Sequence, residues 1–85
     1  MTNFTTESAL RAILEAVIGK RVVPAVLNDD TQLLGAIPEL DSMAVVGILT
    51  QIQDDFGCEI DDDEVSAEIF ETFGALRRFV DAKLG

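Results

Sequence analysis

Ser42 is the residue of this sequence best placed for chemistry, and another protein would have to carry that chemistry out. It lies in the segment Glu39-Leu40-Asp41-Ser42-Met43, at the start of an apolar pattern with helical spacing. From Val22 to Leu76 the chain has thirteen Asp and Glu residues and no Lys or Arg. A helix N-terminus offers free N–H groups and the positive end of the helix dipole, so it suits a phosphodiester on this hydroxyl. An enzyme with a basic surface could find such a site.

The same segment also has a plain structural interpretation. Ser and Asp commonly begin helices, because their side-chain oxygens accept hydrogen bonds from the free N–H groups of the first turn. Either Asp41 or Ser42 can therefore supply the N-cap of the helix that follows. Asp41 also places a carboxylate beside the hydroxyl that would be modified.

The sequence lacks the residue sets that most catalytic and metal sites need. It has no His, which excludes Ser-His and Cys-His nucleophile pairs, and no glycine-rich phosphate loop. The consecutive acids Asp61-Asp62-Asp63-Glu64 lack the alternating ligands and central Gly of a calcium loop, which favours a solvated turn. Cys58 has apolar neighbours and only acids nearby in sequence, which favours a small buried side chain over a reactive thiolate. We expect no catalytic residue, no metal site and no enzymatic activity.

Composition and charge narrow the class of protein. The 85 residues, 48% of them hydrophobic, suffice for a single domain over residues 1–85. A net charge of −10 argues against nucleic acid and anionic membranes, and favours basic partner proteins. No stretch approaches the roughly 20 apolar residues of a membrane span, and residues 1–7 lack a signal-peptide pattern. One Cys excludes an internal disulfide, and we expect a cytoplasmic monomer.

Periodicity and turn residues predict three long helices and a short one. The long helices run from Thr5 or Thr6 to Gly19, from Ser42 to Phe56 before Gly57, and onward from Thr72 as N-cap. The residues expected to face the core are Leu10, Ile13, Leu14 and Val17, then Met43, Val46, Leu49, Ile52 and Phe56 beside Val45 and Ile48, then Phe73, Leu76, Phe79, Val80 and Leu84. Residues 66–70 would form the short element.

The connection over residues 22–40 is long, irregular and apolar. Pro24, Gly35, Pro38 and the run Asn28-Asp29-Asp30 oppose a regular helix through it. Its apolar residues, expected to pack along the core, are Val22, Val23, Val26, Leu27, Leu33, Leu34 and Ile37. The predicted fold class is all-α, a four-helix bundle with three long helices, one short helix and a long first loop.

From about Thr6 to Leu84 the chain resembles the acyl carrier protein family, which includes peptidyl and related carrier domains. Asp41-Ser42-Met43 is similar to the family's Asp-Ser-Leu attachment motif, with Met in place of Leu. Phe56-Gly57-Cys58-Glu59-Ile60 is similar to the close of the family's second helix. Phe70-Glu71-Thr72-Phe73-Gly74-Ala75-Leu76 resembles the entry into its last helix. Three segments at the right spacing on an acidic chain make the resemblance specific.

The resemblance implies a bundle of acyl-carrier type and a non-enzymatic carrier. Ser42 would bear 4′-phosphopantetheine, attached covalently from coenzyme A by a magnesium-dependent phosphopantetheinyl transferase, with Asp41 as a flanking recognition residue. The arm's thiol would hold acyl or aminoacyl groups as thioesters. It would present them to acyl-loading and acyl-accepting enzymes with basic docking patches, in fatty acid, lipid, polyketide or other secondary-metabolite biosynthesis. In this family an acyl chain can enter between the second and third helices, here near Met43, Val46, Ile60 and Ile69.

Departures from the family pattern favour a specialised pathway. The second helix begins with the neutral run Met43-Ala44-Val45-Val46-Gly47, and acids return only at Asp54 and Asp55. Leu40 stands where many members have Gly, and the segment between Ile60 and Thr72 is longer than in primary carriers. Two other interpretations stay open: an acidic helical protein-interaction module without a prosthetic group, and a D-alanyl or peptidyl carrier.

Overall fold

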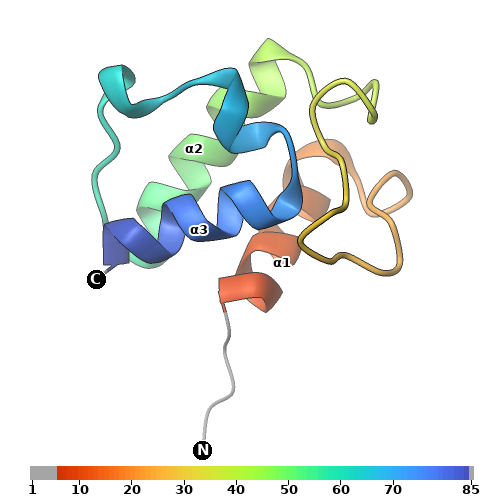
Figure 1. Ribbon diagram of the computed structural model, residues 1–85, viewed down its shortest axis with the longest axis horizontal. Helices are drawn as coiled ribbons and strands as arrows, with labels where there is room; N and C mark the ends of the chain where they lie inside the picture. Colours follow the sequence, from red (N-terminus) through yellow and green to blue (C-terminus); the bar gives the residue numbers. More distant parts are fainter. Residues whose placement is uncertain (1–5, 85) are drawn as a thin grey trace, which may run out of the picture.

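The computed structural model describes residues 6–84, and Figure 1 shows the arrangement of its three α-helices. These helices pack around one apolar core. The elements in chain order are α1 (Thr6–Ile18), α2 (Ser42–Phe56), the 3-10 segments η1 (Asp62–Glu64) and η2 (Ala67–Phe70), and α3 (Phe73–Leu84). Helix α1 packs against both α2 and α3, and η2 packs against α3. The described residues include no β-strand, only an isolated antiparallel bridge between Gln32 and Thr72.

The three predicted long helices are confirmed, whereas the short fourth helix takes a different form. Gly19 and Gly57 follow α1 and α2 with φ of 104° and 66°, values that favour glycine and end each helix. Thr72 caps α3, because its Oγ1 accepts a hydrogen bond from the Ala75 N–H at 3.1 Å. Thr6 is the first helical residue of α1, and Thr5 lies outside the described residues. The predicted short helix is the 3-10 segment η2, preceded by a second 3-10 turn.

The core is entirely apolar in the described part of the chain. Its buried side chains are Leu10, Ile13, Leu14, Val23, Leu33, Ile37, Leu40, Ala44, Ile48, Ile52, Phe70, Phe73, Leu76 and Val80. Each of the three helices contributes to this set, and so does the long loop. Two predicted core residues outside α2 are wrong: Val26 is 73% exposed in the loop, and Leu84 is 46% exposed at the end of α3.

The predicted inner face of α2 is confirmed for Ile48 and Ile52, and Val45, Leu49 and Phe56 pack half-buried against the core, but it is wrong for Met43 and Val46. Ala44, Ile48 and Ile52 are the buried residues of this helix, whereas Met43 and Val46 are 80% and 62% exposed. Apolar residues surround the first turns of α2, so their spacing alone does not select one face. Packing against α1 selects it.

Backbone hydrogen bonds attach the long loop, residues 19–41, to the segment that leads into α3. The N–H groups of Leu33 and Leu34 donate to the carbonyls of Glu71 and Phe70 at 3.0 and 2.9 Å. The prediction that this loop packs along the core is therefore confirmed. The pairing that holds it there was not visible in the sequence.

Asp29 marks the close approach of the loop to α3. The Gly74 N–H donates to the Asp29 carbonyl at 3.1 Å. A Cβ on Gly74 would lie 2.7 Å from Asp29 Cβ and 2.8 Å from its Cα and carbonyl oxygen, so only glycine fits. Asn28 shapes the turn, since its Oδ1 accepts from the Asp30 N–H at 2.9 Å.

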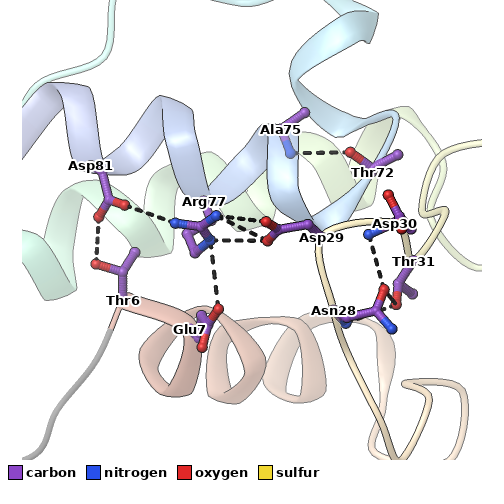
Figure 2. A network of polar contacts seen from close by, with 10 residues as sticks. All are labelled: Thr6, Glu7, Asn28, Asp29, Asp30, Thr31, Thr72, Ala75, Arg77 and Asp81. Atoms are coloured by element: carbon purple, nitrogen blue, oxygen red, sulfur yellow. Dashed lines mark hydrogen bonds and ion pairs between the residues drawn. The ribbon is translucent and has the colours of Figure 1, made fainter.

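Arg77 of α3 links the loop to both terminal helices (Figure 2). Its guanidinium donates to both carboxylate oxygens of Asp29, with Nη2 at 3.0 Å from each. It also pairs with Glu7 of α1 at 3.6 Å and with Asp81 at 3.4 Å, and Asp81 accepts from the Thr6 hydroxyl at 2.7 Å. The hydrogen bonds to Asp29 raise the pKa of Arg77, which keeps the guanidinium charged.

An ion pair holds η1 to the end of α3. Lys83 Nζ donates to the two carboxylate oxygens of Glu64 at 2.7 and 2.8 Å, and the Asp61 N–H donates to the same carboxylate at 3.0 Å. The hydrogen bond from Lys83, followed by that from Asp61, lowers the pKa of Glu64. The hydrogen bond to Glu64 raises the pKa of Lys83.

We expect Gly74→Ala to destabilise the protein by about 2 kcal/mol or more. Overpacking against the backbone of Asp29 costs about 1–3 kcal/mol and also threatens the loop hydrogen bonds, which outweighs the helix propensity gained by Ala. Chemical denaturation measures the change. Gly47→Ala is the control, because its Cβ would meet only the Val17 side chain, at 3.3 Å. Equal effects of the two substitutions would contradict this account of the loop.

We expect the Glu64 carboxyl to titrate below its ordinary value of 4.5 and to move upward in Lys83→Met. Since the folded pKa of Glu64 is lowered, the stability it contributes is present above about pH 4.5 and is lost as pH falls through the folded pKa. Carbon-13 NMR titration of the carboxyl provides the measurement. Arg78→Met removes an exposed cation from the same helix and should leave the midpoint in place. If Lys83→Met leaves the titration midpoint of Glu64 unchanged, the Glu64–Lys83 ion pair does not form in solution.

Candidate functional site

Ser42 is the exposed first residue of α2, and Asp41 immediately before it is the N-cap. The Asp41 backbone is extended, with φ −104° and ψ −171°. Its Oδ1 accepts from the Ala44 N–H, and its carbonyl accepts from the Val45 N–H, both at 2.9 Å. Of the two cap candidates in the sequence, the structure selects Asp41. Among residues 6–84 the Ser42 hydroxyl has no hydrogen-bond partner.

Buried residues of the loop fix where α2 begins. Leu33, Ile37 and Leu40 are all buried in the core. The Ile37 N–H donates to the Leu33 carbonyl and the Leu40 N–H donates to the Ile37 carbonyl, each at 3.0 Å. Two consecutive turns therefore lead to Asp41, and their side chains Leu33, Ile37 and Leu40 are buried in the core. Leu40, which departs from the family pattern, is part of this anchor.

The surroundings of the hydroxyl suit an anionic substituent. Ser42 stands at the N-terminal end of a 15-residue helix whose first turn contains no acidic residue. The dipole of this helix and its first N–H groups favour negative charge at that end. The neighbouring Asp41 carboxylate is turned to the helix backbone by its bond to Ala44. An exposed oxygen at this place fits the phosphodiester of 4′-phosphopantetheine.

Of the four residues predicted near an acyl-chain entrance, Met43 and Val46 are exposed on α2, and the entrance itself stays a prediction. Ile60 and Ile69 are half-buried and pack against the core. Cys58 also packs there, half-buried, as a free thiol.

The structure was also searched for pockets, metal-binding groups and membrane-spanning helices. A pocket of about 350 Å³ opens between α1 and the loop, lined by Glu7, Ser8, Arg11, Ala25, Val26, Leu27 and Phe73. In the described part of the chain, no group of three or more His, Cys, Asp or Glu residues could hold a metal ion. No helix between residues 6 and 84 is long and apolar enough to cross a membrane.

The sequence indicated Ser42 and Asp41 as candidate site residues, but it did not indicate the contacts that hold their loop. Asp29 and Arg77 lie 48 residues apart, and neither belongs to a motif. Gly74 was seen only as part of the entry into the last helix. Gly74 lies three residues before Arg77, so both are on the side of α3 that contacts Asp29. The sequence alone does not show this contact.

Comparison with known proteins agrees with this geometry. A family profile described as "Phosphopantetheine attachment site" matches residues 8–80. Among solved structures, the solution NMR structure of a holo acyl carrier protein from Nitrosomonas europaea is 44% identical in sequence, with a TM-score of 0.84. That match covers 95% of this chain and 98% of the other. The comparison with curated protein sequences found no match.

The profile spans most of the chain, and the structural match extends over nearly the full length of both proteins. Both agree with the resemblance seen in the attachment motif, at the end of α2 and at the entry into α3. The chain therefore belongs to the acyl carrier protein family, in which 4′-phosphopantetheine is the covalently attached prosthetic group.

Proposed function

We propose that Ser42 carries the 4′-phosphopantetheine of this chain. The protein would then be a carrier without catalysis of its own, serving a dedicated pathway of fatty acid, lipid or secondary-metabolite biosynthesis. The observation that carries the proposal is the division of roles at the start of α2. Asp41 caps the helix, so the neighbouring Ser42 hydroxyl is exposed and without a hydrogen-bond partner in the described chain.

Each residue at the helix start has a separate role in this proposal. Ser42 Oγ supplies the ester oxygen, and the N-terminus of α2 stabilises the negative charge placed on it. Asp41 holds the first turn in shape through Ala44 and so fixes the direction of the Ser42 side chain. When bound, the prosthetic group supplies a flexible arm whose terminal thiol holds acyl groups as thioesters.

The charge of the chain supports partners with basic surfaces. The sequence carries a net charge of −10, and thirteen of its sixteen acids fall between residues 22 and 76. A field of one sign speeds the encounter with an oppositely charged enzyme. The phosphopantetheinyl transferase and the acyl-loading and acyl-accepting enzymes are the partners that this field would attract.

Incubation with coenzyme A, magnesium and a broad-specificity phosphopantetheinyl transferase should add one phosphopantetheinyl group, measured as intact mass. Ser42→Ala should remain unmodified. Ser66→Ala is the matched control, because Ser66 is also an exposed serine that starts a helical segment and makes no side-chain cap bond. It should be modified like the natural chain. An unmodified natural chain would refute the proposal and favour the acidic interaction module, whereas modification of Ser42→Ala would refute Ser42 as the attachment residue and place the group elsewhere.

We expect the free energy of unfolding to depend on Asp41 more than on Ser42, although only Ser42 is needed for modification. Asp41→Ala removes the N-cap hydrogen bond and should lower the free energy of unfolding by about 1 kcal/mol. Ser42→Ala should change it by less than about 0.5 kcal/mol, because that exposed hydroxyl makes no cap bond. Urea denaturation of both variants measures this. A larger loss for Ser42→Ala than for Asp41→Ala would mean that Ser42 is the cap in solution.

A further inference from the structure

The pocket between α1 and the long loop, called the α1 pocket below, lies far from Ser42. Its volume is about 350 Å³, and its lining comes from the first half of α1, residues 25–27 of the loop and Phe73 of α3. Figure 1 shows the start of α1 and the start of α2 at opposite edges of the molecule. A protein bound in the α1 pocket therefore leaves the Ser42 hydroxyl uncovered.

The apolar part of the α1 pocket is already in place in the free chain. Phe73 is 1% exposed, and its N–H donates to the Thr31 carbonyl at 2.8 Å. Leu27 is half-buried and packs against the core, and the turn that follows it is closed by a bond from the Asn28 N–H to Thr31 Oγ1 at 2.9 Å. Val26 also lines the pocket and is 73% exposed. An apolar side chain can cover Val26 without reordering the loop, and such preorganisation favours binding.

The volume of the α1 pocket suits one large side chain. Pockets for small molecules and cofactors commonly span about 300–1,000 Å³, so this pocket is near the small end of that range. At protein interfaces, a few large side chains that enter pockets supply most of the binding energy, and Trp is among the most frequent of them. A protein segment that inserts one apolar side chain is therefore the occupant that fits.

Negative charge at the edge of the α1 pocket selects the residues that accompany this side chain. The carboxylates that face Arg77 are those of Glu7, Asp29 and Asp81. Three carboxylates against one guanidinium leave two negative charges uncompensated in this cluster. Glu7 also lines the pocket, and its side chain is 55% exposed. Arg11, the cation of the lining, is paired with Glu15 at 3.1 Å. A Lys or Arg beside the apolar side chain complements this edge.

We propose that the α1 pocket docks a partner protein through a large apolar side chain that has a Lys or Arg next to it in sequence. The apolar side chain covers Val26 and rests on Phe73, and the neighbouring cation meets Glu7. Because the pocket and Ser42 lie at opposite edges, the partner can hold the chain while other proteins act at Ser42. This docking goes beyond the proposed function and does not depend on attachment at Ser42.

The test is a titration of the probe peptide acetyl-Gly-Lys-Trp-Lys-Gly-amide with the full-length chain. The chain contains no Trp and no Tyr, so tryptophan fluorescence reports the peptide alone. Entry of the indole into the pocket should shift its emission to shorter wavelength and saturate with a Kd of roughly 1–10 mM, as expected for one buried side chain and an exposed ion pair. The same peptide with Ser in place of Trp should not displace it. Displacement at equal concentration would mean that charge alone binds the peptide, and the proposal would be wrong.

Substitution of two exposed valines places the peptide on the chain. Val26→Lys removes apolar contact and adds a cation at the pocket, and should weaken peptide binding by about tenfold. Val46→Lys is the matched control, because Val46 is an exposed valine of α2, at 62%, and the change in net charge is the same. It should leave the Kd unchanged. Both variants should unfold like the natural chain, since the altered residues are exposed. Equal weakening by the two substitutions would mean that only net charge matters.

Nitrogen-15 NMR of the natural chain locates the bound peptide independently. Amide shifts should concentrate on residues 25–27 and Phe73 and be absent at Ser42. Ser42→Ala should bind the peptide with the natural Kd, so this inference and the attachment at Ser42 can fail separately. Shifts centred on α2, or a titration without saturation, would overturn the inference. If the natural chain dimerises in sedimentation and Val26→Lys abolishes this, the occupant is a second copy and the inference is again wrong.

Discussion

At Gly74 the long loop approaches α3 so closely that no side chain fits between them. The Asp29 carbonyl accepts the Gly74 N–H, and the Asp29 carboxylate receives the Arg77 guanidinium. Arg77 also reaches α1 through Glu7, so one cation joins three parts of the chain (Figure 2). Because backbone meets backbone at this point, the loop has little freedom to shift along α3. The other loop contacts depend on this register.

The position of Ser42 follows from that register. Leu33 pairs with the backbone before α3 and enters the core, and two turns then bring Leu40 into the core as well. The next residue, Asp41, caps α2 and leaves the Ser42 hydroxyl to solvent. The proposed function needs the Ser42 oxygen to be exposed, yet held at a defined place. The loop holds that place through its buried side chains Leu33, Ile37 and Leu40, and the neighbouring Asp41 carboxylate caps the helix.

Local patterns predicted much of this fold, because helix ends depend on nearby residues. Gly19, Gly57 and Thr72 mark the predicted ends, and α2 has its predicted bounds. Met43 and Val46 were wrongly predicted to face the core, because apolar side chains surround the first turns of α2 and packing with α1 decides which of them are covered. The η2 segment was expected as a short helix and is a single 3-10 turn. Contacts between distant residues, such as Asp29 with Arg77, left no local pattern at all.

The sequence by itself determined the resemblance of Asp41-Ser42-Met43 to an attachment motif, the lack of any His to pair with its serine, and the acidic charge around it. These follow from residue types and short spacings, which are readable along the chain. Only the tertiary structure decided that Asp41 rather than Ser42 is the cap, and that Met43 and Val46 face solvent beside the hydroxyl. Asp41 and Ser42 can both cap a helix, and the first turns of α2 are apolar on both sides. Packing against α1 decides which side of α2 is buried, and the anchored loop decides which residue caps the helix.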